Sequence, residues 1–336
     1  MLRPFRPLVA VLLVVAAAQG STPAARTVTL AAPTATVATI ARAIEEQTGT
    51  ALDVSAADAT KVIPASFDRV DFWKAVESVA DRTGTHIVSA GGKTALKPGK
   101  SAAPSFVSGP FRFVAREVLV RGDLGGGTAT YDVAVDVCWE PWLNAYRIDT
   151  SPTIDRAADD ASKPLTFPPA AARTFTSGTV AALAVRPRGL ARASKSFSLA
   201  GSIRVTVADE LLTFTFDATT GQATAPATHS GVSAVVKKFG PDGPDWAAEI
   251  ELRYPKSDVT WESNEDYWPR GNRLRLIPTT GDPITAELDN LDLPVIRYAV
   301  KGGAKKLGKG WKLEYRTPGP MREIVVPFEL KNLALP

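Results

Sequence analysis

The chain has 336 residues, of which 45% are hydrophobic and 22% are charged, and its formal net charge is +4. These proportions are typical of a globular protein and exclude a disordered or coiled-coil chain, and the length allows two or three domains. Because Arg3 and Arg6 are the only charged residues among the first 20, the charge falls to +2 without that segment, and so weak a field predicts no nucleic-acid partner.

Residues 1–20 have the pattern of a secretory signal peptide. Arg3 and Arg6 precede an apolar run at residues 8–18, and the small residues of 18–20 form a cleavage site. The apolar run is too short to span a bilayer as a helix, although an uncleaved anchor is the alternative. No cysteine lies near the cleavage site, so the lipid-anchor signature is absent. We expect a periplasmic or secreted protein that does not span the membrane after cleavage.

The segment 28–96 contains one pattern twice. The stretches TIARAIEEQTGTALDVS and KAVESVADRTGTHIVSA align at a constant offset of 35 residues, which indicates two copies of one supersecondary unit. In each copy apolar residues at positions i, i+3, i+4 and i+7 predict a one-sided helix. Thr36 and Asp71 are placed to cap the helix starts with their side chains, and Gly49 and Gly84 are placed to end the helices.

Short extended segments flank both helices and give the order β-α-β-β-α-β, with room for one more strand. We therefore expect an α+β domain at residues 27–97, in which both helices cover one small sheet. The segment resembles the short N-terminal domain of secretins and of TonB-dependent receptors that signal, through QTGT at Gln47 and RTGT at Arg82. The resemblance implies an extracytoplasmic protein-interaction module without catalytic residues. The sequence beyond it does not look like a secretin pore, so that family's transport role is not expected here.

The second predicted helix carries two candidate residues for docking a protein partner, Trp73 and Glu77. Trp73 lies beside the apolar stripe, so it either covers the edge of the core or contacts the partner. An open sheet edge is a second possible docking surface, because strand addition needs no special side chains. The partner expected is an unidentified extracytoplasmic protein.

Residues 98–109 are rich in Pro, Gly, Ser and Lys and are expected to form a linker. Beyond it lie six of the seven tryptophans and all six tyrosines, which indicates a change toward strands. We expect an all-β antiparallel region of immunoglobulin-like sandwiches, one at 110–220 and a second at 230–336, with one larger sandwich as the alternative. Strands are expected at residues 111–120, 130–138, 145–149, 174–185, 195–207, 211–216, 232–238, 247–254, 273–277, 284–288, 296–300, 311–315 and 323–330.

The region 105–336 also has a loose family resemblance. GPFRFVAREV near its start and VPFELKNLALP at its end resemble segments of secreted β-sandwich proteins of planctomycete-type bacteria. This resemblance implies no known activity.

Few residues suggest catalysis. The chain has two histidines, His86 and His229, and no zinc, α/β-hydrolase or P-loop signature. Cys138 is the only cysteine, so it forms no intramolecular disulfide and is either a buried core residue or a reactive thiol. We expect no enzyme, no cofactor and no bound metal.

The segment WESNEDYW combines carboxylates and an amide with flat aromatic rings. Such rings can stack on sugar faces while the carboxylates bind hydroxyl groups, and the same oxygens can bind Ca²⁺. A pair of carboxylates for glycoside hydrolysis is also conceivable. The alternative is a long loop whose tryptophans cap the sandwich core. The candidate ligand-binding residues are Trp261, Glu262, Asn264, Glu265, Asp266, Tyr267 and Trp268.

These observations predict a non-enzymatic extracytoplasmic protein-interaction or scaffold protein, in which a docking module is carried on β-sandwich spacers. The alternative is a carbohydrate or envelope-polymer binder that uses the 261–268 loop, with a polysaccharide as its partner.

Overall fold

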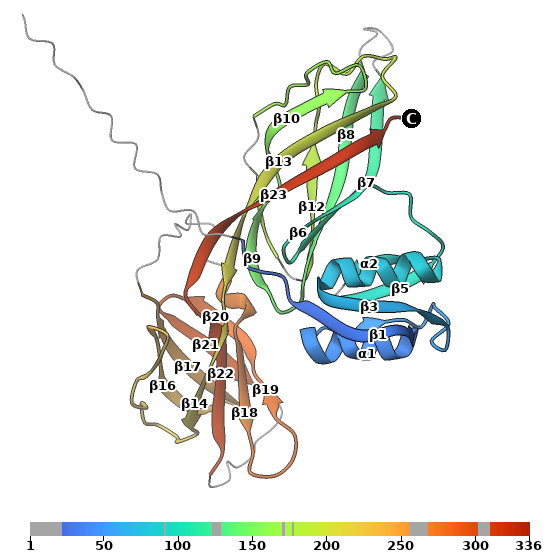
Figure 1. The fold of residues 1–336 in the computed structure, drawn as a ribbon. Coiled ribbons are helices and arrows are strands. Elements are labelled where there is room, and N and C mark those ends of the chain that lie inside the picture. The colour runs from blue at the N-terminus through green and yellow to red at the C-terminus, as the bar shows by residue number, and fades with distance from the viewer. Residues whose placement is uncertain are drawn as a thin grey trace, which may run out of the picture.

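The computed structural model describes residues 22–90, 92–122, 129–169, 172–176, 178–255, 268–301 and 310–336. These residues form mostly antiparallel β-sheet with two α-helices (Figure 1). Three hydrophobic cores divide them into an N-terminal module, a first sandwich and a second sandwich.

The module contains both α-helices. Helix α1 (Val37–Thr48) and helix α2 (Phe72–Thr83) are each 12 residues long, and each is followed by a glycine in the left-handed conformation, Gly49 at φ 69° and Gly84 at φ 73°. The helices therefore lie where the repeated pattern predicts them. The strands of the module are β1 (Thr27–Thr36), β2 (Leu52–Asp53), β3 (Val62–Asp71), β4 (Thr85–Ala90) and β5 (Lys93–Pro98).

These strands form two sheets and not the single sheet expected from the sequence. Strand β1 pairs with β3, whereas β2, β5 and β4 form a separate sheet in which β2 is parallel to β5. The short strand β2 pairs with β5 alone, so no described strand joins the two sheets. The expected βαββαβ arrangement on one sheet is therefore not confirmed, although both helices bury their apolar faces in one shared core.

The two helix starts differ in a way that the repeat does not predict. The side-chain oxygen of Thr36 accepts a hydrogen bond from the main-chain N–H of Thr39 at 3.2 Å, as expected. Asp71 occupies the corresponding position of α2, but its side chain makes no capping hydrogen bond. Its carboxylate lies 2.7 Å from the Lys74 ammonium instead. The predicted side-chain cap at Asp71 is therefore wrong, because a nearby cation binds the carboxylate.

We expect Thr36→Ala to lower the free energy of unfolding by about 1 kcal/mol, because it leaves an N–H of the first helical turn without its partner. Asp71→Ala removes only a partly exposed ion pair and is expected to cost less, about 0.5 kcal/mol. Urea denaturation of both variants measures the difference. A larger loss for Asp71→Ala than for Thr36→Ala would contradict this assignment of the caps.

The first sandwich consists of two sheets around one core. Strands β12, β8, β7 and β6 form one sheet in this order. The other sheet is built on β13, which pairs with β9 and β10 along one side and with β23 along the other, while β11 extends the sheet beyond β9. The strands are β6 (Ser105–Ser108), β7 (Phe111–Gly122), β8 (Ala129–Trp139), β9 (Asn144–Asp149), β10 (Thr153–Asp159), β11 (Arg173–Phe175), β12 (Val180–Val185), β13 (Ser196–Ala208) and β23 (Met321–Ala334).

The second sandwich also consists of two sheets. One has the order β14, β22, β18, β19, and the other has the order β15, β16, β17, β21, β20. Its core includes the rings of Tyr298 and Tyr315, which are both buried. Its elements are β14 (Leu211–Asp217), β15 (Ala227–His229), β16 (Val232–Asp242), β17 (Asp245–Arg253), the 3₁₀ turn η1 (Trp268–Gly271), β18 (Arg273–Ile277), β19 (Ile284–Thr285), β20 (Glu287–Asp292), β21 (Val295–Val300) and β22 (Lys312–Pro318).

The C-terminal strand β23 returns to the first sandwich, so the second sandwich is an insertion between β13 and β23 (Figure 1). Five residues of β23 enter the first core, namely Ile324, Val326, Phe328, Leu330 and Leu333. The Phe328 ring stacks on Phe113 with 4.8 Å between ring centroids. The expected boundaries at 110–220 and 230–336 are therefore corrected, and the second sandwich spans 211–318. The last part of the expected linker 98–109 is also corrected, because residues 105–108 form strand β6, which pairs with β7.

The two sandwiches are joined by two neighbouring chain segments. Strands β13 and β23 pair as far as Ala208 and Met321, and the pairing resumes at once between β14 and β22. Between these ladders the N–H of Gly319 donates to the carbonyl of Glu210 at 2.9 Å. This continuous ribbon holds the second sandwich against the first.

Candidate functional site

The predicted ligand-binding loop lies almost wholly outside the described residues. Residues Trp261, Glu262, Asn264, Glu265, Asp266 and Tyr267 lie outside the described residues. Trp268 begins the turn η1, and only its backbone is described. Sugar or Ca²⁺ binding at this loop remains a prediction.

The two predicted docking residues contact the first sandwich of their own chain. The Trp73 side chain is fully buried, and its ring N–H donates to the carbonyl of Pro110 at 2.9 Å. The Glu77 carboxylate accepts hydrogen bonds from Arg112 at 2.8 Å and from the Ser105 hydroxyl at 3.1 Å. The prediction of a separate partner at Trp73 and Glu77 is therefore corrected, because the sandwich already covers this face of α2.

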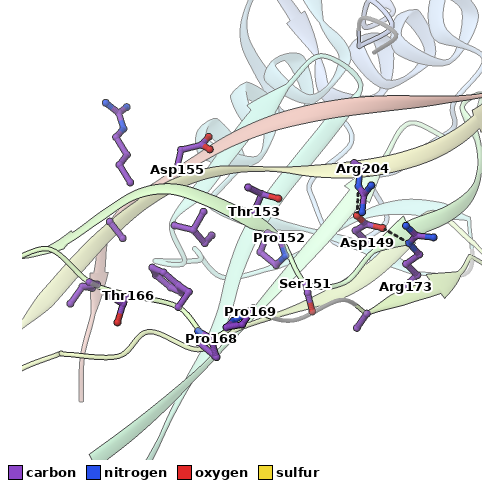
Figure 2. A pocket seen from close by; sticks show the side chains of 16 residues that line it. Asp149, Ser151, Pro152, Thr153, Asp155, Thr166, Pro168, Pro169, Arg173 and Arg204 are labelled. Atoms are coloured by element: carbon purple, nitrogen blue, oxygen red, sulfur yellow. Dashed lines mark hydrogen bonds and ion pairs between the residues drawn. The ribbon is translucent and has the colours of Figure 1, made fainter. Parts of the chain in front are cut away.

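A groove of about 750 Å³ lies beside β10 on the first sandwich (Figure 2). It forms because β9 and β10 lie one after the other along β13, and the chain leaves β13 between them at residues 150–152. Residues 165–169 provide further lining. Strand β10 was not predicted, because its sequence TIDRAAD has neither clear alternation nor a run of β-branched residues.

One part of the groove carries a cluster of charges, in which Asp149 lies between two arginines (Figure 2). Its carboxylate oxygens are 2.8 Å from Nε of Arg204 and 3.3 Å from Nε of Arg173. The hydrogen bond to Asp149 raises the pKa of the Arg204 guanidinium above its usual value. Glu323, which lies 3.9 Å from Arg204, also pairs with Arg147. The charged residues that line the groove carry three positive and two negative charges, one positive charge in excess; they are Asp149, Asp155, Arg156, Arg173 and Arg204.

The rest of the groove is lined by flat apolar groups and by hydroxyls. The apolar surface comes from Pro152, Pro168, Pro169 and Phe167. The hydroxyl-bearing residues Ser151, Thr153 and Thr166 also line the groove. Neither histidine of the chain lines the groove, since one lies on β4 and the other on β15. The described lining therefore does not assemble a hydroxyl nucleophile with a histidine base. A groove of this shape suits an extended chain with a negative group.

The charged residues of the groove were missed by the sequence analysis. Asp149, Arg173 and Arg204 belong to β9, β11 and β13, three strands that are far apart in the sequence. No spacing rule connects them. The one available signal was Pro152 and the pair Pro168 and Pro169, which mark interruptions of the strands.

Neither described helix has the length and hydropathy needed to cross a bilayer. Within the described ranges, no three His, Cys, Asp or Glu side chains gather as a metal site requires. Comparison of the chain with protein-family models, with curated proteins and with solved structures finds no match. The resemblance of the module to the N-terminal domain of secretins therefore stays a prediction.

Proposed function

We propose that the chain is a non-enzymatic interaction protein that works outside the cytoplasm, and that the groove beside β10 receives an extended segment of its protein partner. The observation that carries this proposal is an outer strand whose open edge lies beside an arginine cluster. Immunoglobulin-like sandwiches and a secretin-type module, both expected from the sequence, fit an exported scaffold of this kind.

The open edge of β10 supplies main-chain hydrogen-bonding groups. Residues 163–165 cover the end of the strand, where the N–H of Leu165 donates to the carbonyl of Ala157 at 3.0 Å. Among the described residues, no strand pairs with the other side of β10 along its first half. Asp155 has no partner in the β13 register, because β10 contains an extra residue there. A partner strand can add to such an edge through main-chain hydrogen bonds alone.

The arginine cluster indicates the charge of the segment that binds. The Arg204 side chain is 45% exposed, whereas that of Asp149 is 13% exposed, so the guanidinium is the more accessible group. Guanidinium groups bind carboxylates through charge-assisted hydrogen bonds. We therefore expect a bound segment with an Asp, a Glu or a C-terminal carboxylate near Arg204.

The proposal is tested by selecting peptides from a random library on the full-length chain and measuring their affinity by fluorescence anisotropy. We expect the selected peptides to be acidic. They should bind the Arg204→Gln variant about ten-fold more weakly than the wild type, since one charge-assisted hydrogen bond contributes about 1.5 kcal/mol. Arg186→Gln is the matched control, because Arg186 also pairs with an aspartate of this sandwich but does not line the groove. A failure to select binders, or equal weakening in both variants, would contradict the proposal.

A further inference from the structure

A carboxylic acid, Glu140, is buried where the module meets the first sandwich. It follows β8 directly, and its side chain is fully buried. One carboxyl oxygen, Oε2, accepts hydrogen bonds from the ring N–H of Trp142 and from the main-chain N–H of Arg26, the latter at 3.3 Å. The other oxygen, Oε1, is buried without any hydrogen-bond partner in the described structure. An ionised carboxylate with an unpartnered oxygen is costly in such a place.

Two charged residues of the module act on Glu140, and they have opposite effects. The Arg26 guanidinium lies 5.0 Å from the centre of the Trp142 ring and also donates to the main-chain carbonyl of Thr48. Its positive charge favours the ionised form of Glu140, whereas the negative charge of Asp71 opposes it. Asp71 is itself bound to Lys74 at 2.7 Å. Between the module and the first sandwich, Glu77 pairs with Arg112 at 2.8 Å.

Burial is the dominant influence on the carboxyl group. It raises the pKa of Glu140 to about 7, and the hydrogen bonds from Trp142 and Arg26 offset only part of this effect. The neutral acid is therefore the form that fits the closed contact.

We infer that the contact between the module and the first sandwich is a pH-sensitive latch, which protonation of Glu140 keeps closed and loss of that proton weakens. The closed contact holds the proton more tightly than an open, hydrated contact does. The closed state is therefore favoured most at low pH. Its advantage falls as the pH rises from the ordinary glutamate pKa of 4.5 toward about 7, and is lowest above that range.

The only cysteine of the chain reports directly on this contact. Cys138 is two residues from Glu140, is 5% exposed, and packs in the core of the module although it belongs to β8. Burial raises the pKa of its thiol to about 11. Because the thiol is buried in the closed contact, a neutral alkylating reagent reaches it when the module and the sandwich separate.

The test is the alkylation rate of Cys138 in the full-length chain from about pH 5 to about pH 8, divided by the rate for a small free thiol at the same pH. This division removes the ordinary effect of pH on thiol reactivity. We expect the protection of Cys138 to fall roughly 10- to 100-fold over this range in the wild type. In Glu140→Gln the protection should stay high and nearly constant, because the amide is neutral and its oxygen can accept the same hydrogen bonds.

Glu117→Gln is the matched control, because it removes a carboxylate from an exposed position of β7 in the same sandwich. It should show the same pH dependence as the wild type. Labelling rates that rise with urea less steeply than global unfolding does identify opening of the contact, because opening exposes less surface. Constant protection in the wild type, or an equal pH dependence in Glu140→Gln, would overturn the inference. If Glu140→Gln does not fold, infrared titration of the wild type decides, since the band of a protonated carboxylic acid should persist to about pH 6.

Discussion

The variant Gly201→Ala is expected to destabilise the first sandwich by about 3 kcal/mol or more. Gly201 lies in β13 opposite Ile154 of the paired strand β10, and an added Cβ would be 2.1 Å from the carbonyl oxygen of Thr153. The obstacle is a main-chain atom and not a flexible side chain, so the strands must separate to relieve the contact. Urea denaturation followed by circular dichroism measures the loss.

The control is Gly122→Ala, at the end of β7, where an added Cβ meets no atom of the described residues within 4 Å. We expect this change to alter the free energy of unfolding by no more than about 0.5 kcal/mol. Because Thr153 lines the groove, Gly201→Ala should also weaken any peptide that binds there. A Gly201→Ala protein as stable as the wild type would show that β10 does not approach β13 this closely.

The variant Phe328→Ala is expected to destabilise the first sandwich, although position 328 follows the whole second sandwich in the sequence. The side chain is 2% exposed, and its ring stacks on Phe113 with an interplanar angle of 17°. Removing a buried phenylalanine leaves a cavity and costs about 3–5 kcal/mol. Hydrogen exchange measured by mass spectrometry should become faster in β7, β8 and β13, and should change least in β16 and β17.

Phe239→Ala is the corresponding variant in the second sandwich. Phe239 is fully buried in the core of that sandwich and packs against Trp246 with ring centroids 5.3 Å apart. Its fastest exchange should appear in β16 and β17. The pair of variants therefore assigns each sandwich its own core. If Phe328→Ala accelerated exchange mainly in the second sandwich, the insertion of that sandwich between β13 and β23 would be refuted.

The binding groove and the latch depend on contacts that no local pattern contains. Asp149 and Arg204 meet because β9 and β13 are neighbours in one sheet. Glu140 is buried because the module packs over the end of β8, and the same packing covers Trp73. From the sequence, Trp73 could cover a core edge or face a partner, and only the neighbouring sandwich decides between these alternatives.

The sequence by itself determined where most helices and strands lie. The apolar periods at Val37 and Phe72 and the glycines that follow placed both helices, because amphipathicity and chain reversal are properties of a short segment. Only the tertiary structure decided which strands pair. Strand β23 has the alternation of any sandwich strand, and pairing with β13 is selected by the fit of Phe328 and its neighbours to a core formed by residues more than a hundred positions earlier. A two-residue period specifies which face of a strand is buried, but it carries no information about the core against which that face packs.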